Sequence, residues 1–146
     1  MSDTLPIEIK GIVPTPAGAG IFLSHGEKMI TIFIDTAIAS SIVMAMEGEE
    51  PERPLTHDLM VSVFQGLGIH MTAGVITAFD NETFFAKLHL LQENELGKEV
   101  VQIDARPSDC IALAARLDAP LYVLKSVWDA AEDMSGVYHT LKKLED

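Results

Sequence analysis

Two stretches of the sequence put ionisable side chains at the start of an expected helix. The first stretch contributes Arg53, His57 and Asp58, and the second contributes Asp104, Arg106, Ser108 and Asp109. Carboxylates bind divalent cations, histidine transfers protons near neutral pH, and arginine donates paired hydrogen bonds to phosphate. A loop that ends in a helix also directs free backbone N–H groups outward. These side chains are therefore candidates for metal binding, proton transfer and phosphate binding.

Each of these residues also has a purely structural interpretation. Asp58 and Asp109 lie in the first turn of their helices, where the helix dipole stabilises a carboxylate. His57 could be a partly exposed histidine at a helix start, and Asp104 could form an ion pair with Arg106. Both arginines precede a proline and could support a loop instead of holding a ligand. The residues alone leave the two interpretations open.

The second stretch leads into a helix that should begin at about Pro107, because the first helical residue loses nothing by lacking an N–H. The helical spacing predicts an apolar stripe that packs inward, formed by Cys110, Leu113, Ala114 and Leu117. The residues expected to face away from the core are Asp109, Ala112 and Arg116.

The first stretch leads into a helix over about residues 57–67, with Thr56 as N-cap and Gly68 just beyond the helix end. Its expected inner face is Leu59, Met60, Val63, Phe64 and Leu67. Because this stripe is wide, the sequence predicts a core helix.

The whole chain of 146 residues is expected to form one compact α+β domain, with a core over about 7–125 and a C-terminal helix and polar tail over 126–146. Strand-rich segments and three to four helices do not alternate strictly, so the sheet should be mostly antiparallel or mixed. Segments 14–20 and 92–98 should be loops. The strand over 83–91 has a mixed face, with Phe85 and Lys87 on it, that should meet solvent or another copy in a homo-oligomer.

The formal net charge of −12 is unfavourable for binding nucleic acid, because affinity for DNA or RNA depends largely on Lys and Arg that displace counterions. The basic residues are scattered, so any binding to DNA or RNA should be weak. One cysteine, Cys110, fits a reducing compartment, and no signal peptide or membrane-spanning stretch is recognisable. We therefore expect a cytoplasmic protein that does not insert into a membrane.

The strings R-P-L-T-H-D-L at 53–59 and I-D-A-R-P-S-D-C-I-A-L-A at 103–114 resemble the two signature motifs of the bifunctional nuclease domain family, long catalogued as a domain of unknown function. The resemblance extends over about 7–123. It implies a compact α+β domain, known from bacteria and plants, with nuclease activity on DNA and RNA assigned to some members. The sequence departs from the family pattern at Ile38, where relatives usually have Glu at the start of the first helix.

By this resemblance, the chain is expected to be a divalent-metal-dependent nuclease that hydrolyses phosphodiester bonds. The expected cofactor is Mg²⁺ or Mn²⁺, held by Asp104 and Asp109, with no organic cofactor. The expected catalytic residues are His57, Asp58, Asp104 and Asp109, and the expected substrate-binding residues are Arg53, Arg106 and Ser108. The alternative hypothesis is a non-catalytic binding or assembly module, in which the same side chains form a structural network of ion pairs.

Overall fold

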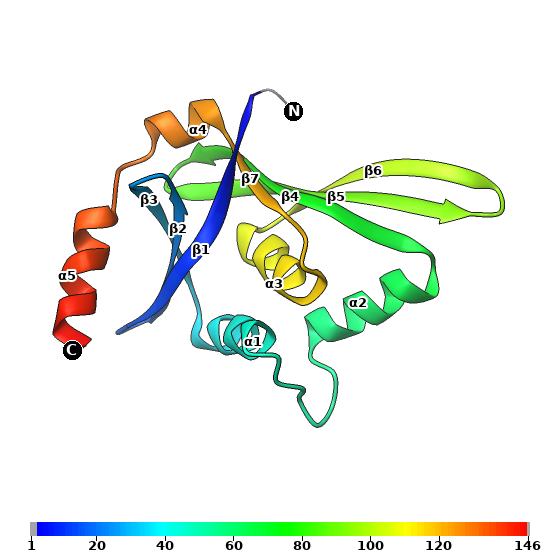
Figure 1. Ribbon diagram of the computed structural model, residues 1–146, viewed down its shortest axis with the longest axis horizontal. Coiled ribbons are helices and arrows are strands. Elements are labelled where there is room, and N and C mark those ends of the chain that lie inside the picture. Colours follow the sequence, from blue (N-terminus) through cyan, green and yellow to red (C-terminus); the bar gives the residue numbers. More distant parts are fainter. Residues whose placement is uncertain (1–2, 146) are drawn as a thin grey trace.

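The computed structural model describes residues 3–145. Within these residues the fold is α+β, as the sequence predicted, with five helices where three to four were expected (Figure 1). The strands are β1 (Thr4–Thr15), β2 (Gly18–His25), β3 (Lys28–Ile34), β4 (Ile69–Asp80), β5 (Thr83–Asn94), β6 (Gly97–Ala105) and β7 (Leu121–Leu124). The helices are α1 (Thr36–Met46), α2 (Thr56–Gly66), α3 (Pro107–Leu117), α4 (Lys125–Ala130) and α5 (Ser135–Glu145). No helix among the described residues has the length and apolar character needed to span a bilayer.

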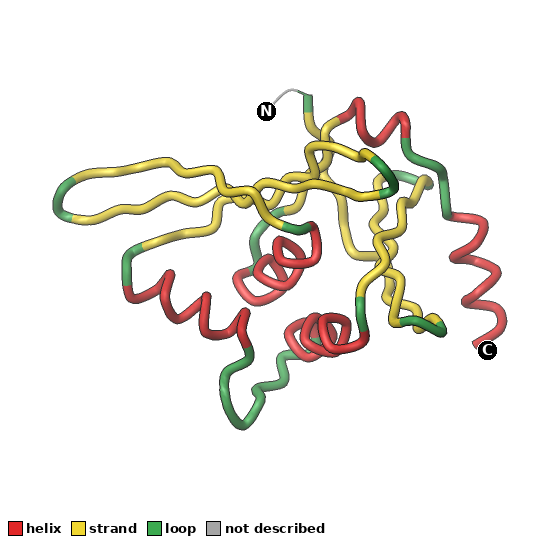
Figure 2. Tube along the Cα trace, turned by 180° about the vertical axis from the view of Figure 1, so that it is seen from behind, coloured by secondary structure: helices red, strands yellow, loops and turns green. Residues whose placement is uncertain are grey.

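The strands form one mixed sheet in the order β3-β2-β1-β7-β4-β5-β6 (Figures 1 and 2). Strands β1 to β3 form one antiparallel unit and β4 to β6 form another. The short strand β7 joins them, antiparallel to β1 and parallel to β4. This arrangement confirms the prediction of a mostly antiparallel or mixed sheet.

Helices α1 and α3 share one core with the β1–β3 unit, and α5 packs on its opposite face. Ile42 of α1 and Ile111 of α3 lie in the same apolar cluster as Ile21 of β2. The neighbouring residue Phe22 points the other way, because side chains alternate along a strand, and it contacts Tyr138 of α5. The β1–β3 unit is therefore covered on both faces.

Helix α3 is buried on nearly every side, which the sequence did not predict. It begins at Pro107, as expected, and ends at Asp118 in a left-handed conformation. Ala112 is fully buried, however, and the Arg116 side chain is only 8% exposed. The expectation that these two residues face away from the core was wrong, because α1 and α2 pack against the side of α3 that faces away from the sheet.

Helix α2 begins at Thr56, one residue earlier than expected. Its N-cap is Leu55, whose backbone N–H donates a hydrogen bond to the Asp58 carboxylate at 2.9 Å. The prediction of Thr56 as N-cap was therefore wrong. Gly68 has a φ of +67° directly after the last turn, as its predicted place beyond the helix end requires.

The expected inner face of α2 was also wrong. Phe64 is buried and Met60 is half-buried, whereas Leu59, Val63 and Leu67 are 58%, 47% and 56% exposed. These three side chains follow each other around one flank of the helix, at steps of four residues. The periodicity identified an apolar flank correctly, but nothing in the described chain packs against it.

Two predicted loops are largely strand. β1 continues through Pro14 to Thr15, and β2 begins at Gly18, so the expected loop over 14–20 is a tight turn. Pro14 is tolerated because β7 pairs only with Thr4–Ile7 and leaves the other side of β1 open there. Similarly, β5 continues to Asn94 and β6 begins at Gly97. Only a two-residue turn therefore remains of the loop predicted over 92–98.

Gly74 of β4 allows α3 to lie close to the sheet. A Cβ atom added at this position would lie 2.8 Å from the Cβ of Cys110 and 3.0 Å from a methyl group of Leu121. Both contacts are closer than carbon atoms normally approach. The distance between α3 and β4 therefore requires glycine here.

We expect Gly74→Ala to lower the free energy of unfolding by about 2 kcal/mol, because an extra methyl group in a tight core forces its neighbours apart. Gly66→Ala is the matched control, since an added Cβ at this last residue of α2 meets nothing within 4 Å. The control should leave stability unchanged or raise it by up to about 1 kcal/mol. Urea unfolding of both variants measures the difference, and equal losses would contradict the close packing.

Candidate active site

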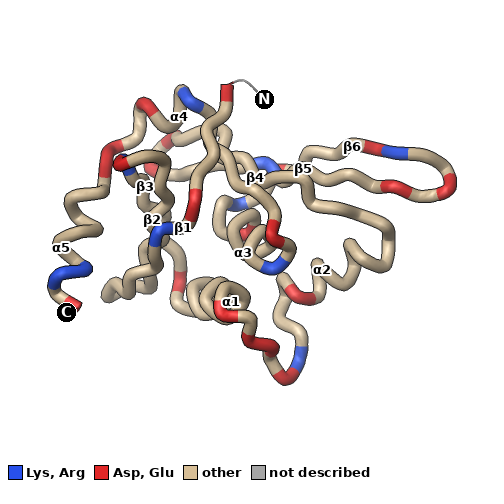
Figure 3. Tube along the Cα trace, in the orientation of Figure 1, with Lys and Arg blue, Asp and Glu red and all other residues tan. Residues whose placement is uncertain are grey.

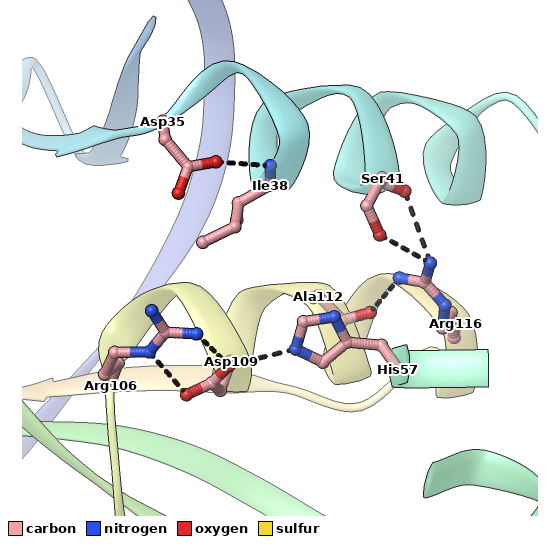
Figure 4. A network of polar contacts seen from close by, with 8 residues as sticks. All are labelled: Asp35, Ile38, Ser41, His57, Arg106, Asp109, Ala112 and Arg116. Atoms are coloured by element: carbon pink, nitrogen blue, oxygen red, sulfur yellow. Dashed lines mark hydrogen bonds and ion pairs between the residues drawn. The ribbon is translucent and has the colours of Figure 1, made fainter. Parts of the chain in front are cut away.

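His57 and Asp109, which are 52 residues apart in the sequence, meet where α2 and α3 begin. His57 Nε2 lies 2.9 Å from Asp109 Oδ1 (Figure 4). Each residue occupies the first turn of its helix, so the two helix starts lie side by side. His57 is 8% exposed, and a polar ring that is so buried requires a hydrogen-bonding partner.

Arg106, the N-cap residue of α3, binds the same carboxylate with two hydrogen bonds. Its Nε lies 3.0 Å from Asp109 Oδ2 and its Nη2 lies 3.0 Å from Asp109 Oδ1. Although burial alone would raise the pKa of Asp109, the hydrogen bonds from Arg106 and His57 bring that pKa below its ordinary value. The hydrogen bond to Asp109 in turn raises the pKa of Arg106. Asp109 is therefore ionised near neutral pH, and both of its oxygens already accept hydrogen bonds.

A second polar network lies around Arg116, near the end of α3. Its Nε donates to Asp58 Oδ1 at 2.7 Å, and its Nη2 donates to Ser41 Oγ at 2.8 Å (Figure 4 shows the contact with Ser41). Its Nη1 donates to the Ala112 carbonyl at 3.0 Å. The hydrogen bond from Arg116 holds the pKa of Asp58 below its ordinary value. This network joins α1, α2 and α3 through one buried guanidinium group.

A hollow of about 340 Å³ opens between the three helices at the first network. His57, Arg106 and Asp109 line it, together with Ser41 and Thr56. A second hollow of about 400 Å³ shares Ile38 and Arg106 with the first and extends to Ser108 and the exposed ring of Phe33. Arg106 and Ile38 therefore border both hollows.

The remaining predicted site residues do not join this cluster. Asp104 lies on β6, paired across the ladder with Lys87. Val101 and Ala105 point from β6 toward the core beneath the helices, so Asp104 points from the opposite face of the sheet. Arg53 is exposed in the loop between α1 and α2, and Ser108 is 5% exposed in the wall of the second hollow.

The side chains present do not fit the expected divalent ion. Asp104 points from the face of the sheet opposite to α3, which carries Asp109, and the Asp109 oxygens are held by Arg106 and His57. Over residues 3–145, no group of three or more His, Cys, Asp or Glu side chains is arranged to hold a metal ion. A tight site for Mg²⁺ or Mn²⁺ needs several oxygen donors that face one point.

Sequence reasoning missed Arg116 and Ser41, because Arg116 was assigned to the solvent side of α3. The available signal was the run Ala112, Leu113, Ala114, Ala115 just before it, since small side chains let another helix approach closely. Cys110, in contrast, was correctly placed in the core. Burial raises the pKa of its thiol to about 12, so it is not a nucleophile near neutral pH.

Comparison with known proteins places the chain in a family. The model of the bifunctional nuclease domain matches residues 21–135, which include both helix starts and the whole of α3. This chain belongs to the bifunctional nuclease domain family. It is also 34% identical over 104 residues to the uncharacterized proteins MT1877 and Rv1829 of Mycobacterium tuberculosis strains CDC 1551 and H37Rv. The match covers 71% of this chain and 59% of the length of each relative.

We expect Arg116→Met to lower the free energy of unfolding by about 3 kcal/mol, because it leaves the Asp58 carboxylate without its buried partner. Lys125→Met is the matched control, since it breaks the exposed pair with Asp129. An exposed pair contributes less than about 1 kcal/mol. Chemical denaturation measures both losses, and similar losses would contradict a structural role for the buried guanidinium.

We expect stability to fall as the pH drops below about 4. Asp58 and Asp109 have a lower pKa in the folded protein than the ordinary 3.8, so their contribution is complete above the ordinary value and is lost as the pH falls through the lowered one. Asp58→Asn and Asp109→Asn should each lose less stability than the natural protein between about pH 6 and pH 3. Urea midpoints measured at both pH values test this, and parallel losses in all three proteins would disprove it.

Proposed function

We propose that this bifunctional nuclease domain hydrolyses phosphodiester bonds of RNA or DNA in the hollow between α1, α2 and α3. The observation that supports the proposal is the contact of His57, Asp109 and Arg106 at one opening. A histidine oriented by a carboxylate beside an arginine is an arrangement suited to proton transfer next to a phosphate.

His57 is the proposed proton-transfer group. Asp109 is ionised and can only accept hydrogen bonds, so His57 Nε2 must donate. In the neutral ring the lone pair is then on Nδ1, which becomes the base that takes a proton from the attacking water. Asp109 fixes the ring orientation and stabilises the positive charge that forms. The bond from phosphorus to the leaving oxygen breaks as the water oxygen attacks, the leaving oxygen takes a proton from solvent, and the protonated ring then releases its proton to solvent.

Arg106 is the proposed phosphate-binding group. Its side chain is 65% exposed, and Nη1 donates none of the hydrogen bonds found within the described residues. This N–H group can therefore bind a phosphoryl oxygen while Nε and Nη2 remain on Asp109. It would stabilise the negative charge that develops on phosphate in the transition state.

The proposal includes no metal ion held by this chain, because the donors of Asp109 are already engaged. Mg²⁺ or Mn²⁺ that accompanies the substrate phosphates could still assist, and the assay below includes both ions. Figure 3 shows Lys and Arg dispersed over the described chain instead of gathered on one face. With a net charge of −12, we expect weak binding of DNA or RNA, with most of the contact energy at Arg106.

A non-catalytic assembly module is the second candidate, and the Arg116 network supports it. Asp58, Ser41 and the Ala112 carbonyl all accept hydrogen bonds from that one guanidinium, so this half of the cluster joins three helices. Under this alternative the His57 and Asp109 pair has the same structural role. The two candidates predict different results in a cleavage assay.

The test is cleavage of fluorescent single-stranded RNA and DNA by the natural protein and by His57→Gln, Arg106→Gln and Asp109→Asn. Loss of a proton-transfer group should slow cleavage about 100-fold or more. Asp104→Asn is the matched control, because that carboxylate lies on the other face of the sheet, and it should cleave within about twofold of the natural rate. Circular dichroism and thermal unfolding verify that each variant folds.

Each reaction is run with Mg²⁺, with Mn²⁺ and with a chelator. Cleavage that survives His57→Gln, or that is lost in Asp104→Asn, would reject the proposed site. No cleavage by the natural protein in any condition, together with reduced stability of His57→Gln, would favour the assembly module.

A further inference from the structure

Strand β6 is an open edge of the sheet, along which Lys98, Glu99 and Asp104 place charges. It pairs with β5 in a continuous register over Gly97–Ala105, and within the described chain no element pairs with its other side. It contains neither proline nor a shift in register, two of the features that usually prevent edge strands from pairing with other chains. The hairpin of β5 and β6 also extends beyond the helices, so this edge is accessible (Figures 1 and 2).

The opposite edge of the sheet, β3, is protected. The backbone N–H of Met29 donates to Asp133 Oδ1, and its carbonyl accepts from the N–H of Met134. The segment before α5 therefore occupies backbone groups of β3 that a further strand would use. These contacts occupy the backbone of one residue of β3, whereas within the described chain no such contact covers the outer side of β6.

Two apolar side chains of β6 are exposed, one on each face of the strand. Val100 is 74% exposed and Ile103 is 44% exposed. On the helix side, Met60 and Phe64 of α2 belong to the same apolar cluster as Val101 of β6. The exposed flank of α2 described above lies on that side of the sheet. Ile103 and the α2 flank are therefore exposed apolar groups on the helix side of the sheet, and such groups are a feature of interaction surfaces.

The charges along β6 are self-complementary. In an antiparallel pair of two β6 strands related by a twofold axis at Val101, Lys98 of each copy lies opposite Asp104 of the other. Glu99 then lies opposite Ile103. Of the neighbouring symmetric registers, the one centred on Gln102 puts Lys98 opposite Arg106, and the one centred on Val100 pairs no charges. Opposite charges across a strand pair stabilise it and like charges destabilise it.

We propose that β6 pairs with β6 of a second copy of this chain, antiparallel and centred on Val101. The joined sheet is then continuous through the twofold axis, and the helices of both copies lie on the same face. The α2 flanks of both copies come to lie on the same face of this junction. The centre of the paired strands, from Val100 to Ile103, carries no charge, so two chains of net charge −12 meet there without direct repulsion. The pairing does not require that the chain cleaves nucleic acid.

The first test is sedimentation equilibrium of the full-length protein over about 1 to 100 µM. We expect a dimer, with a dissociation constant raised at least tenfold in Lys98→Glu and in Asp104→Lys. The double variant Lys98→Glu with Asp104→Lys restores opposite charges and should dimerise like the natural protein. Lys143→Glu is the control, because Lys143 is a distant residue on α5. A natural protein that is monomeric at all concentrations would overturn the proposal. A different protein that occupies the edge in place of a second copy would overturn it too.

The second test fixes the register with a disulfide. Val101→Cys puts two thiols directly opposite each other at the axis, at a Cα separation of about 4.5–5.5 Å that a disulfide can span. Val100→Cys is the control: it is the more exposed position, but it lies opposite Gln102 and should crosslink less. Cys110 is buried and does not interfere. Faster crosslinking of Val100→Cys under mild oxidation would mean that exposure alone governs the reaction, and it would reject this register.

Discussion

The buried guanidinium of Arg116 is the interaction on which the arrangement of the helices depends. A charge with 8% exposure is stable only when it is paired and hydrogen-bonded, and Asp58 and Ser41 meet this requirement from two other helices. Because Asp58 also accepts the N–H of Leu55, the position of Arg116 determines where α2 begins. His57, the neighbour of Asp58, is thereby held against Asp109. The proposed proton-transfer pair is thus a consequence of an ion pair one residue away.

Much of the fold could be predicted from local patterns. Pro107 defined the start of α3, Gly68 the end of α2, and alternating strand segments the mixed sheet, because each of these depends on residues that are close in the sequence. Burial depends on which elements meet, so it was predicted less well. Ala112 was assigned to the surface because the apolar stripe of α3 describes one buried face, whereas α3 has neighbours on several sides.

The candidate site was likewise only partly predictable from the sequence. The sequence identified His57, Arg106 and Asp109 as chemically capable, and the structure brings them together across 52 residues. The sequence alone could not predict that Asp104 is excluded from this cluster. The alternation of Val101 and Ile103 with Gln102 and Asp104 puts Asp104 on the polar face of β6, but the place of that face relative to the helix starts depends on tertiary packing. A one-residue shift in register would have exchanged the two faces.

The distribution of charge explains how an acidic protein can contain a site suited to phosphate. At the hollow, the charges of Arg106 and Asp109 balance each other, and the exposed guanidinium of Arg106 can still meet a phosphate. The site and the open edge of the sheet are also connected, since β6 ends at Ala105 and the next residue is Arg106. A strand paired on both sides holds its last residue more firmly than an edge strand does. Pairing at β6 would therefore restrict the backbone from which Arg106 reaches both Asp109 and the hollow.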